Sequence, residues 1–347
     1  MAPLGTPLTP RRLAGALALA ALAAFVVWWI AFGAETTALD DPANFVFVLL
    51  NGITLAALYF LVASGFTLIF GLMRVVNMAH GAFFLLGGYI ALTLQRRFVG
   101  QGDVSLLSED VGFLRDWLAP LAIACVFVAA LGVGTQQVLL RWNQGQDLRQ
   151  ALITIAVAVI VADFLVEPLG VAKGISFPGS LDKFVDLRVA GVQYSLSRLF
   201  IVAVAVVVGV ALWLWLKKTR TGMIVRAGVD DRQMVSALGI NIQRTFAIAF
   251  AVGSALAALG GVMGGSFASL ATGVDGIWLL NSLVVVIIGG MGSLGGAAIG
   301  ALLYGLVSSF SPAYLPSEYT SYSIIFTFVL LAVVLAVRPL GLFGRPA

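Results

Sequence analysis

Charged side chains are scarce in this sequence. Asp, Glu, Lys and Arg make up 10% of its 347 residues, whereas hydrophobic residues make up 61%. The mean hydropathy is +1.05. Because a soluble domain carries about a quarter charged residues, the composition excludes an ordinary soluble protein and indicates an integral membrane protein. A chain of this length can supply up to about ten membrane segments.

Cysteine and histidine are scarcer still. The sequence has one of each, Cys125 and His80. This excludes a disulfide framework and a CxxC metal site, and it argues against a histidine-based metal site. The pI near 9.4 does not indicate nucleic-acid binding, because the basic residues cluster in short loops between apolar runs.

Nucleotide-binding motifs are also missing. The Walker A sequence GxxxxGK[ST] does not occur. If ATP drives this protein, ATP and its Mg²⁺ must be bound by another polypeptide, and no cofactor is expected in this chain. The run 290–295 does match GxGxxG, but it lies inside a membrane-length apolar run without a strand–turn–helix unit around it. A nucleotide site is therefore not expected there.

The sequence does contain a series of apolar runs of membrane length. They predict one all-α polytopic domain over residues 1–347, with about ten membrane segments when half-helices are counted. The segment 13–33 is longer than a usual signal-peptide core, so we interpret it as a retained first helix, with a signal peptide as the alternative. The expected segments lie at 13–33, 45–72, 82–94, 118–140, 151–169, 198–216, 245–266, 278–310 and 322–337.

A polar insert at 217–244 sets the orientation. Two acidic residues, Asp230 and Asp231, stand there against six basic ones. Short basic loops between membrane segments face the cytoplasm. Alternation along the chain then places both termini in the cytoplasm of a multi-pass protein of the cytoplasmic (inner) membrane. The six basic residues are Lys217, Lys218, Arg220, Arg226, Arg232 and Arg244.

The insert also carries a helix signature. Asp230 is expected as N-cap, Gln233 completes a capping box, and Gly239 ends the helix. The apolar face would have no burial partner within the chain. It either lies on lipid headgroups or docks into a groove of a cytosolic partner. The face consists of Met234, Val235 and Leu238.

The run 278–310 is expected to begin and end outside. The segment before it, 245–266, is expected to end outside, and the segment after it, 322–337, is expected to begin outside. It holds seven glycines from Gly289 to Gly305. A broken or re-entrant helical hairpin turning at 289–296 satisfies these constraints, with a single span beside a misassigned neighbour as the alternative. The glycines proposed to lie on a translocation pathway are Gly289, Gly290, Gly292 and Gly295.

Isolated polar residues complete the candidates for that pathway: Asn77, His80 and Asp163. His80 either caps a helix or bridges two segments, or else it contacts substrate or relays protons. Asp163 lies at the outer end of an apolar segment, where a carboxylate indicates a water-accessible vestibule or a structural contact. A hydrolase using Ser64 with His80 is a weak alternative, because no set of oxyanion donors is apparent.

Four sequence blocks resemble a known family. The first is the insert, with TRTG at 219–222, RA at 226–227, DD at 230–231, LGI at 238–240 and Arg244. The others are VNMAHG at 76–81, IIGGMGSLGG at 287–296 and RPLGLFG at 338–344. Together they are similar to the LivH-type permease subunits of branched-chain amino-acid ABC importers, from about residue 51 to residue 344.

The resemblance implies a transport subunit without enzymatic activity of its own. Its partners would be a homologous LivM-like permease, two cytosolic LivG/LivF-like ATPases, an extracytoplasmic solute-binding protein and the lipid bilayer. Branched-chain amino acids are the expected substrate, with urea or a short amide as the alternative; an ion-coupled secondary transporter is a further alternative. The residues expected at the ATPase contact are Arg220, Gly222, Arg226, Asp230, Asp231, Arg232, Met234, Val235, Leu238 and Gly239.

Overall fold

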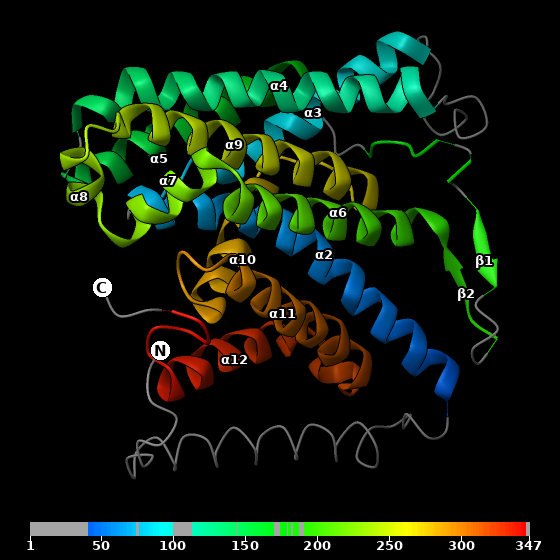
Figure 1. Cartoon of the computed structure of the whole chain (residues 1–347). Coiled ribbons are helices and arrows are strands. Elements are labelled where there is room, and N and C mark those ends of the chain that lie inside the picture. The colour runs from blue at the N-terminus through cyan, green and yellow to red at the C-terminus, as the bar shows by residue number, and fades with distance from the viewer. Residues whose placement is uncertain are drawn as a thin grey trace.

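The computed structural model describes residues 41–73, 76–99, 113–143, 145–169, 174–178, 180–181, 183–186 and 191–344. The expected helix at 13–33 lies outside these ranges. The elements in chain order (Figure 1) are α2 (Pro42–Met73), α3 (His80–Val99), η3 (Phe113–Leu118), α4 (Ala119–Gly134), η4 (Thr135–Leu140), η5 (Arg141–Asn143), α5 (Asp147–Leu169), β1 (Phe184–Asp186), β2 (Gln193–Ser195), α6 (Leu196–Lys218), α7 (Arg220–Asp230), α8 (Arg232–Ala237), α9 (Ile242–Phe267), α10 (Val274–Gly289), α11 (Leu294–Tyr314), η6 (Ser317–Tyr322) and α12 (Ser323–Val337).

The described chain is an all-α polytopic membrane protein, as predicted. Six of its helices are long and apolar enough to cross a membrane, and α10 is a shorter apolar helix. The total of about ten segments stays a prediction, since α3 and α5 are not among the six. The six are Pro42–Met73, Phe113–Asn143, Leu196–Lys218, Ile242–Phe267, Leu294–Tyr314 and Ser317–Val337.

Helix α2 is the centre of the molecule. It is buried continuously from Ala56 to Ile69, as expected of a helix that is apolar on every side. It packs against α9, α11 and α6. In Figure 1 it runs between a group formed by α3, α4, α5 and α9 and a second group formed by α10, α11 and α12.

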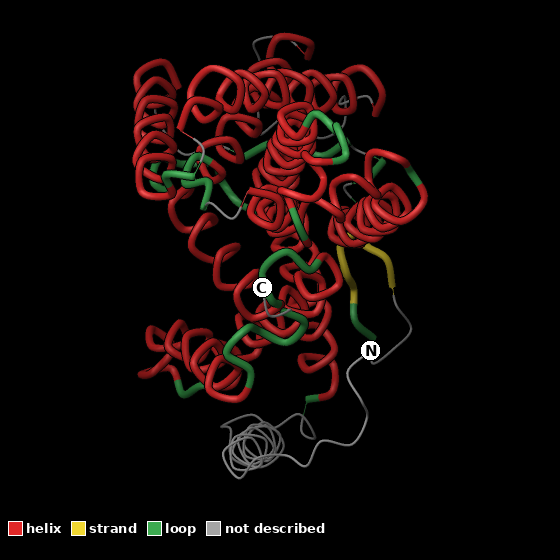
Figure 2. The backbone as a smooth tube through the Cα atoms, turned by 60° about the vertical axis from the view of Figure 1, so that its left-hand side comes forward, coloured by secondary structure: helices red, strands yellow, loops and turns green. Residues whose placement is uncertain are grey.

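Helices α3 and α9 approach closely within the first group. A Cβ atom at Gly261 of α9 would lie 1.8 Å from the carbonyl oxygen of Phe84 in α3. Only glycine permits that backbone contact, which is how small residues bring membrane helices together. Figure 2 shows the molecule turned by 60°, with its helices in red, the loops in green and the two strands in yellow at one side.

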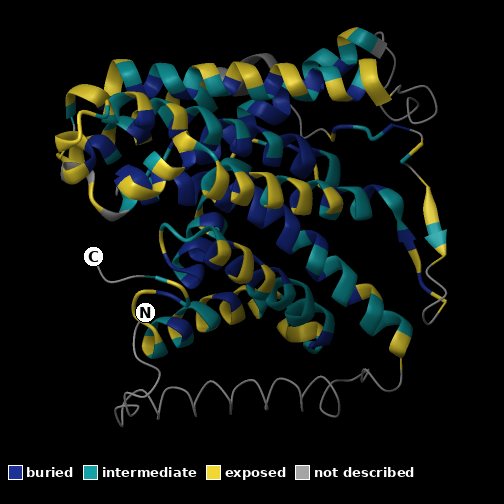
Figure 3. Ribbon diagram, in the orientation of Figure 1, coloured by how far each residue is buried: buried dark blue, intermediate teal, exposed yellow. Residues whose placement is uncertain are grey.

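Figure 3 marks exposed positions along several helices, and many of these positions hold large apolar residues. Val206, Val207 and Val210 of α6 are 51–66% exposed, and Phe328 of α12 is 53% exposed. A soluble monomer rarely exposes apolar patches of this extent. Such faces suit contact with lipid or with another membrane subunit.

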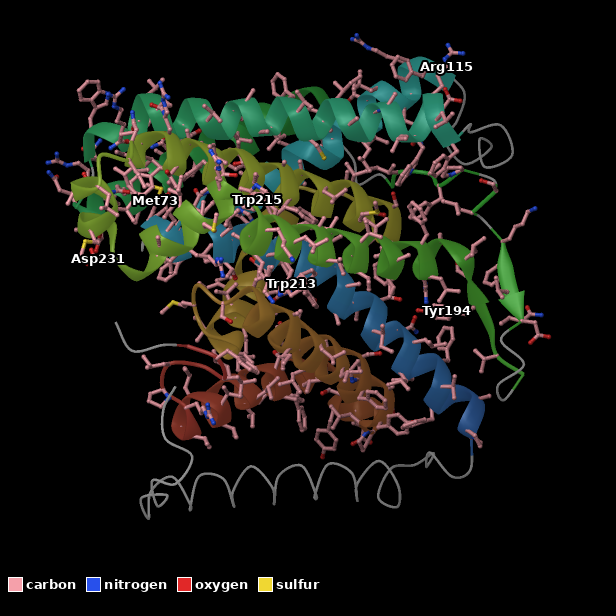
Figure 4. The ribbon with its side chains drawn as sticks, viewed as in Figure 1. Met73, Arg115, Tyr194, Trp213, Trp215 and Asp231 are labelled. Carbon is pink, nitrogen blue, oxygen red and sulfur yellow. The ribbon has the colours of Figure 1, made fainter. Side chains whose placement is uncertain are left out.

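A short β-hairpin precedes α6, in a stretch where the sequence indicates only a loop. β1 pairs antiparallel with β2, and Val185 is opposite Tyr194. The Tyr194 hydroxyl donates to Asn51 Oδ1 at 3.2 Å and lies 2.9 Å from Thr54 Oγ1. Burial raises the pKa of Tyr194, so the hydroxyl remains a neutral donor that fastens the hairpin to α2 (Figure 4).

Candidate functional site

The predicted insert folds into two helices, α7 and α8, of which the sequence indicated only the second. Thr219 caps α7: its Oγ1 accepts from the Gly222 amide at 3.0 Å and donates to the Trp215 carbonyl at 2.7 Å. A Cβ at Gly222 would lie 2.1 Å from that same carbonyl oxygen. Gly222 therefore lets α7 turn tightly against the last turn of α6 (Figure 4).

One face of α7 packs onto the interior of the protein. Val225 is 2% exposed, whereas Arg220 and Arg226 are exposed. Val229 packs against the cluster that includes Leu72 and Met73 at the end of α2. It also faces Gly71 and Gly292, where an added Cβ would lie 3.6 and 3.7 Å from its methyl groups. The insert is thus joined directly to the central helix.

Helix α8 begins one residue later than predicted. Asp230 is the last residue of α7, and Asp231 caps α8 by accepting from the Met234 amide at 3.0 Å. Gly239, with φ +77°, follows the end of the helix as expected. The side chains of Asp230, Arg232 and Gln233 lie outside the described part of the structure.

The predicted apolar face of α8 is divided. Met234 is 59% and Leu238 is 71% exposed, but Val235 is 3% exposed. The prediction that all three share one unburied face was wrong for Val235. The reason is that the short helix lies against the protein, so one apolar position turns inward while the other two remain on the surface.

Helices α10 and α11 form a helical hairpin in the predicted run, with its turn at 290–293. α11 has 21 residues and is long enough to cross a membrane, whereas α10 is shorter, so a re-entrant hairpin stays a prediction. Gly290 has φ +101° and Gly292 has φ +82°, a region that favours glycine. Ser293 caps α11 by accepting from the Gly296 amide at 3.0 Å. A Cβ at Gly289 would lie 2.3 Å from the Gly296 carbonyl, so the two helices meet backbone to backbone. Gly295, in contrast, is exposed with nothing within 4 Å of such a Cβ.

The segment after α12 closes the end of α10. The amides of Leu342 and Phe343 donate to the carbonyls of Ile288 and Gly289, each at 2.9 Å. These are among the carbonyls that a helix end leaves without an intrahelical donor. The RPLGLFG block therefore completes the hairpin turn, a role that the sequence alone did not indicate.

A cavity lies where these parts meet. It is small, with a volume of about 50 Å³, and it is lined by α2, α6, α7, the hairpin turn and the start of α11. Ser64 and Thr67 are the buried hydroxyl residues of its lining, and the exposed Arg226 belongs to the lining on the α7 side. The sequence does not indicate this cavity, because Ser64 and Thr67 lie within an apolar run and no pattern in the run shows which face of the helix lines a cavity.

Comparison with known proteins decides the family. The family described as branched-chain amino acid transport system, permease component, matches residues 48–335. The chain is 30% identical over 304 residues to the high-affinity branched-chain amino acid transport system permease protein LivH of Escherichia coli K12, covering 85% of this chain and 94% of the relative. This chain belongs to the branched-chain amino acid transport permease family.

Other members agree with that assignment. The permease protein BraD of Pseudomonas aeruginosa is 29% identical over 306 residues, covering 86% of this chain and 95% of BraD. A probable LivH of Methanocaldococcus jannaschii is 24% identical over 309 residues, covering 86% and 92%. No solved structure matches.

In this permease, Asn77 and His80 make structural contacts. Asn77 Oδ1 accepts from the Ala79 amide at 3.2 Å near the start of α3. His80, fully buried, places Nε2 2.9 Å from the Val62 carbonyl of α2. This geometry fits the bridging interpretation of His80. Ser64 donates to the Leu61 carbonyl at 2.8 Å, so the two side chains do not form a nucleophile–base pair.

Asp163 does not join these residues. It is exposed on α5, whereas the hairpin glycines and Asn77 are placed by other helices. Within the described ranges, no group of three His, Cys, Asp or Glu side chains could hold a metal ion. The structure therefore brings together the insert and the hairpin turn, but not the full set of predicted pathway residues.

A buried polar network links α2 to α10 and α11 away from the hairpin turn. Tyr304 donates to Asn281 Oδ1 at 2.9 Å, and Asn281 Nδ2 donates to the Tyr59 hydroxyl at 3.4 Å. The rings of Tyr59 and Tyr304 meet edge-on, with centroids 5.0 Å apart. No short motif marks this network, because its members are separated by 23 and 222 residues.

Proposed function

We propose that this chain is the permease subunit of an ABC importer that carries branched-chain amino acids across the cytoplasmic membrane. ATP is hydrolysed by separate cytosolic subunits, and a solute-binding protein delivers the substrate from outside. Family membership supports the transport role. The observation that carries the coupling role is the packing of α7 against the end of α2, with Val229 of α7 and Gly292 of the hairpin turn lining the same small cavity.

The insert has the features of a docking surface for an ATPase subunit. Met234 and Leu238 expose apolar side chains beside a basic loop. Buried at an interface, each can contribute roughly 1.5–3 kcal/mol. The neighbouring charges contribute less, since exposed ion pairs are worth about 0–1 kcal/mol. Docking through a short apolar helix leaves the charges to orient the partner.

Movement of the docked insert would be transmitted to the transport machinery through contacts between rigid elements. α7 touches the end of α2 and the turn between α10 and α11. The same turn is held by the segment after α12. A displacement of α7 would therefore shift the hairpin relative to α2, and two discrete arrangements of such packed helices can couple distant sites.

The membrane placement follows from the same proposal. The insert and both termini lie in the cytoplasm, the β-hairpin before α6 lies outside, and about ten segments cross or enter the bilayer. The α10–α11 hairpin begins and ends outside, and its glycine-rich turn reaches the cytoplasmic side, where α7 and the C-terminal segment lie beside it.

The test of this function is uptake by the complete transporter in vesicles. With ATP and the binding protein present, labelled leucine should accumulate and labelled urea should not. An uncoupler should leave leucine uptake intact, because the energy comes from ATP. Uptake of urea in place of leucine would reassign the substrate, and uptake that needs a proton gradient without ATP would indicate a secondary transporter.

A further inference from the structure

Helix α5 has one face packed against the protein and one face that is exposed along the helix. Ile153 and Val157 lie on the packed side, where they contact buried hydrophobic clusters. The exposed residues span an arc of about 140° on the other side of the helix. This open face of α5 consists of Leu148, Leu152, Ile155, Val159, Ile160 and Asp163.

The apolar residues of the open face are spaced like those of a helix–helix contact. Leu148, Leu152, Ile155 and Val159 follow one another at intervals of four, three and four residues, which is the spacing of a packing seam between helices. The exposed Ala156 stands among them, and small residues let membrane helices approach closely. An apolar seam also suits lipid, so the polar residue on the same face decides what covers it.

That polar residue is Asp163, one helical turn beyond Val159. Its side chain is exposed. Among the described residues the single ion pair joins Arg115 to Asp116, and no hydrogen bond reaches the Asp163 carboxylate. Ionisable side chains within the membrane face protein or a water-filled cavity and not the lipid chains.

The position of Asp163 along α5 places it within the hydrocarbon core. The helix has 23 residues from Asp147 to Leu169 and is about 35 Å long at 1.5 Å per residue, against a hydrocarbon core of about 30 Å. Asp163 lies about 9 Å before Leu169 and about 24 Å after Asp147. Whichever end is aligned with the edge of the core, the carboxylate lies about 6 Å or more inside it. Lipid chains alone are therefore a poor cover for the open face.

Two other exposed apolar faces differ in this respect. The charged residues of α6 are confined to its first three and last two residues, and α12 has none. Their exposed side chains, such as Val207 of α6 and Phe328 of α12, therefore suit lipid. Of these three helices, α5 alone carries a charge in the middle of its exposed face.

We propose that the open face of α5 binds a homologous permease subunit within the bilayer, and that this subunit supplies a cation or hydrogen-bond donors to Asp163. The inference rests on the proposed function, which places α5 across the membrane in an importer of several subunits. A second copy of this chain fits less well. A two-fold interface presents the same patch on both partners, so it would bring two Asp163 carboxylates together at the same depth, where like charges disfavour each other.

The first test identifies what covers the open face. Val159 is replaced by the photoreactive amino acid p-benzoylphenylalanine in the complete transporter, reconstituted in phospholipid vesicles. The matched control carries the same replacement at Val207. Both valines lie near the middle of an apolar helix, and their side chains are 61% and 66% exposed. After irradiation, mass spectrometry should find position 159 joined to the homologous permease and position 207 joined to phospholipid.

Several outcomes of this crosslinking would overturn the proposal. They are a crosslink from position 159 to phospholipid only, to an ATPase subunit or to a second copy of this chain. Equal crosslinking of the homologous permease from positions 159 and 207 would also overturn the assignment to α5.

The second test uses Asp163→Leu, for which protein and lipid predict opposite effects. If a partner subunit pairs with the carboxylate, leucine leaves that partner's polar group without its hydrogen bond. Co-purification of the homologous permease should then fall at least about tenfold, as expected for one hydrogen bond to a charged group. The Tm of the variant chain in detergent should stay level, because Asp163 has no contact to lose within the chain. If lipid covers the face, leucine should leave assembly unchanged, and that result would overturn the proposal.

Asp147→Leu is the control for the second test. Asp147 is also exposed on α5, but it lies about 160° around the helix from Asp163. Its replacement should leave co-purification of the homologous permease at the parent level. Equal losses in the two variants would mean that any change of charge on α5 disturbs assembly, and would overturn the specific role of Asp163.

Both tests can be separated from a failure of the proposed function, because neither depends on transport. If the vesicles take up no leucine with ATP, the proposed substrate is wrong, while a crosslink from position 159 to the homologous permease still supports the interface. Normal leucine uptake together with a crosslink to phospholipid only would overturn the interface and leave the permease assignment intact.

Discussion

Replacement of Gly289 by alanine tests the hairpin most sharply. The added methyl carbon would lie 2.3 Å from the carbonyl carbon and oxygen of Gly296. Both atoms are backbone and cannot rotate away, so α10 and α11 must separate at the turn. Overpacking of this kind costs about 1–3 kcal/mol. Since 1 kcal/mol corresponds to roughly 2–4 °C for a chain of 150–250 residues, the apparent Tm should fall by about 5 °C.

Gly295→Ala supplies the control within the same hairpin. Its added methyl would meet nothing within 4 Å, and alanine favours a helix over glycine by roughly 0.5–1 kcal/mol. Its Tm should therefore stay level or rise slightly. Thermal unfolding of both variants in one detergent, with stimulated ATP hydrolysis measured after reconstitution, makes the comparison. Equal Tm values for the two variants would refute the backbone contact at Gly289.

Three further predictions follow from other parts of the structure. Asn281→Leu removes the hydrogen bonds to Tyr59 and Tyr304. Each bond within a membrane contributes about 0.6 kcal/mol, so the free energy of unfolding should fall by about 1 kcal/mol. A Tm equal to that of the parent would contradict the network. His80→Leu loses the hydrogen bond to the Val62 carbonyl, so the Tm should fall while leucine uptake and its pH dependence persist. Loss of uptake in a variant with the Tm of the parent would instead place His80 on the translocation pathway. In a Cys125→Ala background, an impermeant thiol reagent should label Phe184→Cys and Ser236→Cys from opposite sides of the membrane, and labelling of both from one side would overturn the topology.

The order of the membrane helices could be predicted from the sequence because each apolar run carries its own signal. The bounds of α2, α6, α9 and the α10–α11 hairpin lie within a few residues of the predicted runs. The hairpin was predicted from two signals together: the alternation of membrane sides set by the charged loops, and the high density of glycines in the run 278–310. The β-hairpin before α6 was missed, since strands of three residues leave little periodicity to detect.

The candidate site was predicted less completely, because its contacts join residues far apart in the chain. The sequence does not mark α7 as a helix, because the burial of Val225 and the partial burial of Val229 depend on packing against distant parts of the chain. The inward direction of Val235 depends on that same packing. Asp231 replaced Asp230 as the cap, a shift of one residue that the adjacent aspartates made ambiguous. The hollow beside Thr67 has no sequence signature at all.

The central claim is that the insert couples this permease to its ATPase subunits by docking them through α8, and the double variant Met234→Asp, Leu238→Asp tests it most directly. Both side chains are exposed, so the permease itself should fold normally. Val235→Asp would instead disturb the fold, because Val235 is buried. The measurement is ATP hydrolysis by the reconstituted transporter with leucine-loaded binding protein, together with co-purification of the ATPase subunits. We predict weakened assembly and loss of stimulation; full assembly with full stimulation would contradict the account.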